Sequence, residues 1–259
     1  MQTLELKQLT KKYRHNDEEV AAIENISFTL QEHESLAILG SSGSGKSTLL
    51  QLIDGLIKPS SGEILVDGEA LEGVRDTTAL ILQNLGLLPW KTVLENASLG
   101  LEIRGVSHAE AQERARQSLH EVALEGVDEY YPQELSGGMK QRLAIARALV
   151  MDCDLLLMDE PLSALDALLK EHMQDLLIDT FNRHRYTQIL VTHSIEEAAL
   201  LGTRIAVLGD KPGRIVSMVE NPHELTREYR NSSEIFEMSK LLRYHLNESQ
   251  MRDKPYDEA

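Results

Sequence analysis

Residues 40 to 48 combine glycines, a lysine and hydroxyl groups at a spacing suited to binding phosphate. The segment consists of Gly40, Ser41, Ser42, Gly43, Ser44, Gly45, Lys46, Ser47 and Thr48. Glycine lets backbone N–H groups approach phosphate oxygens, and a helix that begins at the end of the segment adds the positive end of its dipole. Lys46 would reach the β- and γ-phosphates of a nucleotide, and the Ser47 hydroxyl would bind its Mg²⁺, an ion that prefers oxygen ligands.

The flanking residues supply the strand and the helix that such a loop requires. An apolar run at 35–39 predicts a buried strand before it, and a helix-like run follows at 48–53. The alternative is a flexible loop, rich in glycine and serine, that happens to contain a lysine. Because the motif is defined by its place between a strand and a helix, the flanking runs favour the phosphate loop.

Polar residues that could do chemistry end three other apolar runs. Gln83 follows 79–82, the pair Asp159 and Glu160 follows 155–158, and His193 follows 188–192. Ligands of α/β proteins bind at the carboxyl ends of parallel strands, so these side chains are expected to meet at one sheet edge. An isolated acidic pair or a lone histidine after a strand would more often be structural. The phosphate loop upstream favours a chemical role instead.

A second pair of glycines precedes another predicted helix. Leu135 is followed by Ser136, Gly137, Gly138 and Met139, and a helical apolar face continues to Val150. Small residues before a helix N-terminus form a second anion-binding arrangement. A chain needs only one such arrangement to hold its own nucleotide.

Tyr13 is the one aromatic residue singled out for a nucleotide. It lies between Lys12 and Arg14 in the region 3–30, whose alternating apolar residues predict short antiparallel strands. Its ring could provide a stacking platform for adenine. A half-exposed strand tyrosine without such a role is the alternative, and it carries about equal weight for the residue taken alone.

The remaining patterns predict one domain and a short extension. Helical periodicity over about 88–150 indicates a helical lobe inserted into an α/β core that spans residues 1–220. From 221 to 259 the chain becomes polar, and residues 247–259 have too few apolar side chains to fold.

The composition of the chain indicates which partners and which cellular location to expect. The 259 residues are 42% apolar and carry a formal net charge of −16, which argues against non-specific nucleic-acid binding. The N-terminus lacks a signal-peptide pattern, and the chain has no apolar run of the roughly 20 residues that cross a membrane. The single cysteine, Cys153, cannot form an internal disulfide. The sequence therefore predicts a cytoplasmic protein without a nucleic-acid partner.

The order of these motifs over about residues 3–220 resembles an ABC-type ATPase subunit. The resemblance implies an α/β fold, a P-loop NTPase core with an N-terminal antiparallel β subdomain and an inserted α-helical subdomain. The roles implied are adenine stacking for Tyr13, Walker A for residues 40–48, Q-loop for Gln83, signature for Ser136, Gly137, Gly138 and Met139, Walker B for Asp159, catalytic base for Glu160, D-loop for Asp166, and switch for His193. Catalysis is then expected of Glu160, His193 and Gln83, and Mg²⁺ binding of Ser47, Gln83 and Asp159.

Two positions depart from the family pattern. Met139 stands where glutamine is commonest, and His33 occupies a turn where glycine is usual. Neither change removes a group expected to touch the chemistry, because Ser136 and the two signature glycines are present.

Other features of the sequence indicate which branch of the ABC family it resembles. Residues 86–90 and 93–96 resemble the importers of nitrate, aliphatic sulfonates, taurine and thiamine-precursor pyrimidines. Three other branches of the family are excluded. Residues 129–134 lack the segment rich in glycine and glutamate that exporters carry before the signature, and the helical lobe lacks the long coiled coils of chromosome-maintenance relatives. Translation-factor relatives have two cassettes in one chain, whereas this sequence has one. The transported solute cannot be read from the sequence, because the family implies that selectivity lies in other subunits.

The resemblance implies partners as well as chemistry. ATP and Mg²⁺ are expected between two head-to-tail ATPase subunits, each signature completing the other's site. The groove between the core and the helical lobe, near residues 87–95, is expected to receive a cytoplasmic helix of a permease. The permease would link the complex to an extracytoplasmic solute-binding protein, so the subunit would lie peripherally on the cytoplasmic face of the membrane. The alternative is a soluble ABC-type regulatory or assembly ATPase without a permease. A phosphate-loop kinase is a third possibility, and the signature argues against it.

Overall fold

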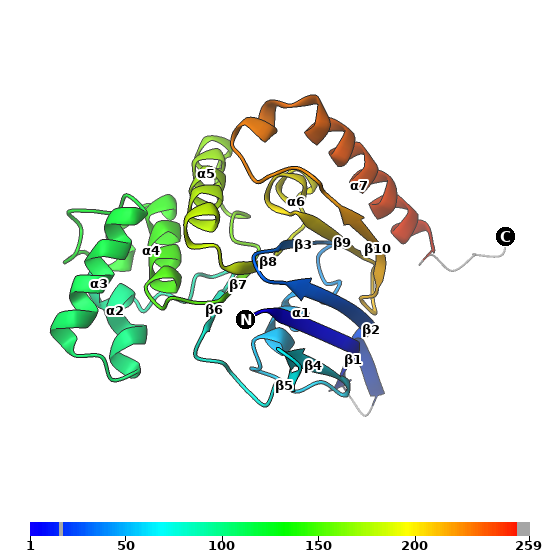
Figure 1. The fold of residues 1–259 in the computed structure, drawn as a ribbon, viewed down its shortest axis with the longest axis horizontal. Helices are drawn as coiled ribbons and strands as arrows, with labels where there is room; N and C mark the ends of the chain where they lie inside the picture. The colour runs from blue at the N-terminus through cyan, green and yellow to red at the C-terminus, as the bar shows by residue number, and fades with distance from the viewer. Residues whose placement is uncertain (16–17, 253–259) are drawn as a thin grey trace.

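The structure is a computed structural model that describes residues 1–15 and 18–252, and it contains two β-sheets with helices around them (Figure 1). The antiparallel sheet has the order β2-β1-β4-β5, and the larger sheet has the order β10-β9-β3-β8-β7-β6. The strands of the first are β1 (Thr3–His15), β2 (Glu18–Gln31), β4 (Ser61–Val66) and β5 (Glu69–Ala70). Those of the second are β3 (Ser35–Leu39), β6 (Thr78–Ile81), β7 (Leu155–Asp159), β8 (Thr187–Thr192), β9 (Arg204–Leu208) and β10 (Ile215–Glu220).

The first two strands are longer than the short strands expected from the sequence. They contain 13 and 14 residues, and their pairing is interrupted by register shifts between Leu6 and Lys12. The turn that follows β2 contains His33, whose backbone is left-handed (φ 62°). Glycine adopts this conformation without steric cost, which explains why glycine is usual at this position of the family pattern.

The centre of the larger sheet is parallel and fully buried. Every residue of β3, β7 and β8 is buried, as the unbroken apolar runs predict for a sheet covered on both faces. Successive side chains point to opposite faces. Leu36 and Ile38 therefore pack in one core with α1 (Lys46–Ile53) and the antiparallel sheet, while Ala37 and Leu39 pack in the other core with the remaining helices.

A helical lobe lies between β6 and β7 in the chain and stands to one side of the sheets (Figure 1). It consists of α2 (Val93–Ile103), α3 (His108–Glu121), the short η1 (Pro132–Glu134) and α4 (Gly137–Leu149). Each long helix begins at a hydroxyl side chain that accepts a backbone N–H: Thr92, Ser107 and Ser136. Such caps satisfy amide groups that have no partner within the helix.

The C-terminal region is folded against the core. It follows α5 (Ala167–His184) and α6 (Ile195–Leu201) and consists of η2 (Glu228–Asn231) and α7 (Ser233–Arg252). Its buried apolar residues are Leu225, Tyr229, Met238 and Leu242. The sequence predicts that residues 247–259 do not fold, and this prediction is wrong for residues 247–252, which form the last part of α7. The helix packs on the core through an apolar face at residues 235, 238, 242 and 246, and residues 247–252 continue it. Residues 253–259 lie outside the described part of the chain.

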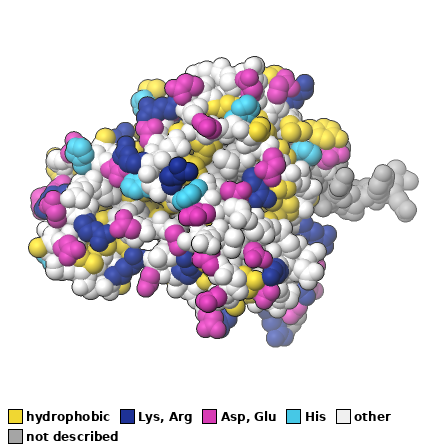
Figure 2. All heavy atoms as spheres, viewed as in Figure 1, with side chains coloured by type: hydrophobic (Ala, Val, Ile, Leu, Met, Phe, Trp, Pro, Cys, Tyr) yellow, Lys and Arg dark blue, Asp and Glu magenta, His cyan; other side chains and the backbone are white. Residues whose placement is uncertain are grey.

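Within residues 1–15 and 18–252 no helix is both long and apolar enough to cross a membrane. Acidic and basic side chains are interspersed on the face shown in Figure 2, which carries no continuous basic stripe.

Asp54, the residue that caps the C-terminal end of α1, provides a test of the packing around this helix. It is 6% exposed, and burial raises the pKa of its carboxyl to about 6. Because the carboxyl ionises less readily in the folded protein than in the unfolded chain, folding opposes its ionisation. The free energy of unfolding therefore decreases as the pH rises from about 4, the pKa in the unfolded chain, to about 6, the pKa in the folded protein. We expect Asp54→Asn to raise the free energy of unfolding by on the order of 2 kcal/mol at about pH 8 and by less at about pH 4.5. Urea titrations of both proteins measure the difference, and an equal effect at the two pH values would contradict this account of Asp54.

Candidate nucleotide-binding site

The phosphate loop joins β3 to α1 and is closed by a buried lysine. The Lys46 side chain is 4% exposed, and its Nζ donates hydrogen bonds to the carbonyl oxygens of Gly40 (3.0 Å) and Ser41 (2.7 Å). Gly45 begins the helix with a left-handed backbone (φ 92°), and a Cβ there would lie 2.5 Å from Ile23 Cγ2. Both the conformation and the close approach exclude a larger residue.

The carboxyl end of β7 brings both predicted acids to this loop. Ser47 Oγ donates to Asp159 Oδ1 at 3.1 Å, so the hydroxyl and the carboxylate lie side by side. Burial raises the pKa of Asp159, and the hydrogen bond from Ser47 partly opposes the shift. These two oxygen donors suit a small, hard divalent cation.

Glu160 lies between a lysine and a histidine. Its Oε1 is 3.4 Å from Lys46 Nζ, and its Oε2 is 3.1 Å from His193 Nδ1. The backbone of Glu160 is left-handed (φ 46°) and its N–H donates to the Val191 carbonyl at 3.0 Å. The parallel pairing of β8 with both β7 and β3 therefore brings together three groups that are far apart in the sequence.

A cavity of about 430 Å³ lies at the phosphate loop, and Asp159 and His193 contact residues of its lining without lining it themselves. Of the residues predicted to bind or process a nucleotide, those that line it are Tyr13, Ser42, Gly43, Gly45, Lys46, Ser47, Thr48, Gln83 and Glu160. Tyr13 is 43% exposed, with Lys11 Nζ over its ring at 5.3 Å from the centroid. An open aromatic face beside a phosphate loop has the arrangement needed to stack on a base.

Sequence reasoning missed two polar residues near this cavity. Lys211 lines it, and the Asp210 carboxylate accepts a hydrogen bond from Ser41 Oγ. Both lie in the turn between β9 and β10, where the Gly-Asp-Lys-Pro-Gly sequence predicts only a turn. The signal that could have found them is the topology, because β9 pairs with β3 in parallel and thus ends beside the phosphate loop.

The Q-loop is held by another residue that the sequence did not reveal. Arg147, on α4, donates to the carbonyl oxygens of Gly86 (2.7 Å) and Leu85 (2.6 Å), and burial lowers its pKa. Leu85 itself has a left-handed backbone (φ 62°). The segment after Gln83 is therefore tied to the helix that carries the signature.

The signature residues do not line the cavity of their own chain. Ser136 caps α4 by accepting the Met139 N–H at 3.3 Å, and both Ser136 and Gly137 are exposed. Gly138 is buried, and a Cβ there would lie 2.5 Å from Leu169 Cδ1, so the glycine allows α4 to approach α5. The variant residue Met139 is half-buried and packs against the core.

Asp166 likewise lies outside the cavity. It caps α5 by accepting the Leu169 N–H at 3.1 Å. The structure thus separates the predicted residues into two sets, one around the phosphate loop and one on α4 and α5.

Comparison with known families now identifies the fold that holds these residues. The sequence profile described as ABC transporter matches residues 23–163, a range that includes the phosphate loop, the Q-loop, the signature and both acids. This chain belongs to the ABC transporter family. The predicted resemblance and fold class are confirmed.

Relatives of this ABC ATPase match most of its length. It is 41% identical over 239 residues to an uncharacterised ABC transporter ATP-binding protein of Methanocaldococcus jannaschii, covering 92% of this chain and 89% of the relative. The taurine import ATP-binding protein TauB of Pseudomonas aeruginosa is 41% identical over 229 residues (88% and 86%). The nitrate import ATP-binding protein NrtD of Synechocystis sp. is 40% identical over 252 residues (93% and 95%).

A solved structure also matches. The dimeric, post-hydrolysis form of the ATP-binding cassette MJ0796 bound to ADP and Pi superposes with a TM-score of 0.76 at 33% identity, covering 85% of this chain and 99% of that one. Together with the family match, this similarity confirms the prediction that the ABC ATPase hydrolyses ATP. A regulatory ATPase without a permease is not favoured, because the named relatives are importer subunits.

Tyr13 gives a test of the base-binding end of the cavity. Because stacking does not depend on the edge of the base, Tyr13→Ala is expected to weaken ATP and GTP binding alike, by roughly 1–3 kcal/mol. Titration of both nucleotides by calorimetry measures the change, with Tyr130→Ala, an exposed tyrosine of the helical lobe, as the control. Selective loss of ATP binding would indicate a contact to the edge of adenine instead.

Proposed function

We propose that this ABC ATPase couples ATP hydrolysis to the import of a small solute of the nitrate, sulfonate or taurine class, or of a thiamine precursor. The observation that carries the proposal is the similarity to two importer subunits over 88% and 93% of the chain. The finer identity of the solute is not encoded in the nucleotide site.

The roles proposed for the site follow from its contacts. Lys46, which is buried and fixed by hydrogen bonds to the loop carbonyl oxygens, holds the phosphates together with the loop N–H groups. Glu160 takes the proton of the attacking water, and His193, at 3.1 Å, orients that carboxylate. Ser47, Asp159 and Gln83 would hold Mg²⁺, an ion that neutralises charge on the phosphates when bound.

The separation of the two residue sets supports a site shared between two copies. Ser136 and Gly137 are exposed at a helix N-terminus, which favours anions, yet they do not line their own chain's cavity. We therefore assign them to the γ-phosphate held by a second ATPase subunit. Two chains would enclose two ATP molecules, and hydrolysis would release the closed dimer.

An exposed aromatic patch supports a permease contact on the helical lobe. The side chains of Trp90, Tyr130 and Tyr131 are 70%, 47% and 40% exposed. The Val93 N–H donates to the Tyr130 carbonyl at 2.8 Å, which joins the two segments of the patch. Exposed aromatic residues are more frequent in protein–protein interfaces than on the rest of a protein surface.

A buried asparagine keeps the segment before α2 rigid. Asn96 is fully buried, accepts the Leu88 N–H at 2.8 Å and donates to the carbonyl oxygens of Leu88, Lys91 and Thr92. A cytoplasmic helix of the permease would dock here, and the permease in turn would hold the solute-binding protein on the other side of the membrane. This arrangement would place the ABC ATPase peripherally on the cytoplasmic face.

Recovery from membranes tests this assignment. The wild-type protein is expected to co-purify with a hydrophobic permease, and Trp90→Arg to reduce its recovery at least about tenfold, since buried aromatic anchors contribute 2 kcal/mol or more. Ile103→Arg is a matched control, because Ile103 is an exposed apolar residue of the same lobe (77%) outside the patch. Equal loss in both variants, or no membrane partner for the wild type, would favour a regulatory ATPase without a permease.

A further inference from the structure

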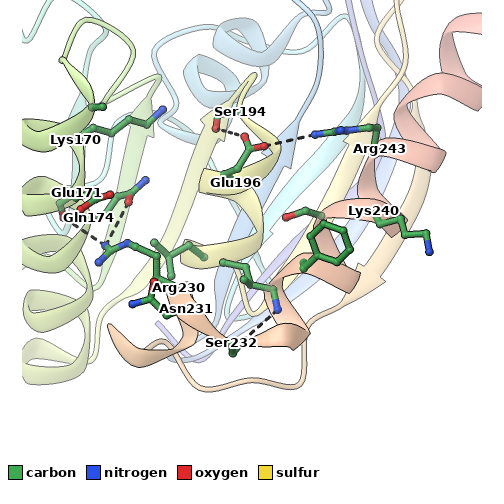
Figure 3. A pocket seen from close by; sticks show the side chains of 15 residues that line it. Lys170, Glu171, Gln174, Ser194, Glu196, Arg230, Asn231, Ser232, Lys240 and Arg243 are labelled. Carbon is green, nitrogen blue, oxygen red and sulfur yellow. Dashed lines mark hydrogen bonds and ion pairs between the residues drawn. The ribbon is translucent and has the colours of Figure 1, made fainter.

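Two cavities of this structure are lined by cationic side chains, and they differ in whether those cations are paired with acids. The larger cavity, of about 780 Å³, lies between α5, α6, η2 and α7 (Figure 3). Each cation of its lining forms an ion pair, and the pairs are Lys170 with Glu197, Arg230 with Asp175, Lys240 with Glu237 and Arg243 with Glu196. Within the described part of the chain, this lining therefore holds no cation without an acidic partner.

The cavity at the phosphate loop does contain such a cation. The charged residues of its lining are Lys46, Glu160 and Lys211. Lys46 pairs with Glu160 at 3.4 Å, so these two charges offset each other. Lys211 is exposed, and among residues 1–15 and 18–252 its ammonium has no ion pair or hydrogen bond. Lys211 therefore gives this lining its net positive charge.

The turn between β9 and β10, which carries Lys211, is packed against the phosphate loop. A Cβ on Gly213 would lie 2.0 Å from the carbonyl oxygen of Ser44, a separation that no larger residue could adopt. The Asp210 carboxylate accepts a hydrogen bond from the hydroxyl of Ser41, so it is directed toward the loop. These contacts fix the backbone on both sides of Lys211.

The Lys211 side chain lies over the middle of the phosphate loop. A Cβ on Gly43 would lie 3.2 Å from Lys211 Cε and 3.6 Å from Lys211 Nζ. Gly43 lines the cavity and has a left-handed backbone (φ 83°). The backbone N–H groups of such a loop surround the phosphates of a nucleotide, so a bound phosphate chain would lie within reach of this ammonium.

We propose that Lys211 is a further phosphate-binding residue of this ATPase, and that its ammonium contacts the phosphate chain of ATP or ADP from the β9–β10 turn. The inference rests on the nucleotide site proposed above. Because Lys46 is already paired with Glu160, the second lysine supplies positive charge that no side chain of the lining offsets. A nucleotide would bind Lys211 without breaking an ion pair, although the exposed side chain would lose conformational freedom.

Calorimetry with ADP measures this contact without hydrolysis. We expect Lys211→Ala to weaken ADP binding about five- to tenfold, less than the loss of a buried lysine, because ordering an exposed side chain opposes part of the gain. Lys211→Arg keeps a cation that binds phosphate and should stay within about twofold of the wild type. Equal ADP binding by the wild type and Lys211→Ala would overturn the proposal.

Arg214→Ala is the matched control. Arg214 is an exposed cation of the same turn, but it pairs with Glu24 and does not line the cavity. Its removal changes the net charge of the protein by the same amount, so ADP binding should remain unchanged. An equal loss in Arg214→Ala and Lys211→Ala would show an effect of the turn or of total charge, and would overturn the contact.

The salt dependence of the Lys211→Ala effect separates a charge contact from a change in the shape of the loop. Salt screens exposed charges, so the ratio of the two ADP affinities should be smaller at about 0.5 M than at about 0.05 M salt. A loss that is the same at both concentrations would mean that Lys211 acts through packing, and would overturn the proposal.

Steady-state assays with ATP test the same role during turnover. Within the described residues no contact joins Lys211 to Glu160 or His193, so the variant should raise KM about five- to tenfold and change kcat by less than about twofold. A lower kcat with an unchanged KM would overturn a binding role. Absence of ADP binding by the wild type would overturn the nucleotide site itself, whereas equal binding by the wild type and Lys211→Ala overturns only the role of Lys211.

Discussion

Replacing Lys46 by alanine is expected to weaken ATP binding roughly tenfold to a hundredfold and to abolish productive hydrolysis. A hydrogen bond to a charged group contributes about 1.5–3 kcal/mol, and each 1.4 kcal/mol of binding free energy corresponds to about a tenfold change in affinity. Lys46 is fixed by two backbone carbonyl oxygens and by Glu160 at 3.4 Å. Its removal therefore frees the loop and the base as well as the phosphates, and a misplaced γ-phosphate reacts slowly.

Nucleotide titration and steady-state assays measure the two effects. Lys12→Ala is a suitable control, because Lys12 is an exposed lysine paired with Glu19 and does not line the cavity. Unchanged turnover in Lys46→Ala would contradict the assignment of the phosphate loop.

Glu160→Gln is expected to retain ATP binding while losing a factor of roughly 10²–10⁴ in turnover, the contribution of a general base. Glutamine keeps the shape of the side chain and a hydrogen bond to His193, but it cannot accept the proton of water. Single-turnover measurement separates the chemical step from binding, with Glu19→Gln, an exposed acid outside the cavity, as the control. Loss of affinity together with turnover would mean that Glu160 chiefly positions Lys46.

The main site could be predicted because its parts follow strands in the sequence. Parallel pairing of β6, β7, β8 and β3 brings together the ends of apolar runs, so Gln83, Glu160 and His193 could be expected near Lys46. The buried central strands were predictable for the same reason, since an unbroken apolar run requires cover on both faces.

Contacts between distant elements were not predictable. Arg147 holds the Q-loop from α4, and Lys211 enters the cavity from a turn that follows a strand at the other side of β3. Neither has a local pattern, because its partner is set by tertiary packing. The C-terminal helix was missed for another reason: its apolar residues at 235, 238, 242 and 246 are separated by charged ones that dominate the composition.

The central claim is that two copies of this chain complete each other's ATP sites, and the association state of Glu160→Gln tests it most directly. Light scattering after size-exclusion chromatography compares this variant with ATP and with ADP, alone and combined with Ser136→Arg. Because closure requires bound ATP and opening requires hydrolysis, we predict a dimer for Glu160→Gln with ATP, a monomer with ADP, and a monomer for the double variant with either nucleotide. A dimer that forms equally with both nucleotides, or that survives Ser136→Arg, would contradict the shared site.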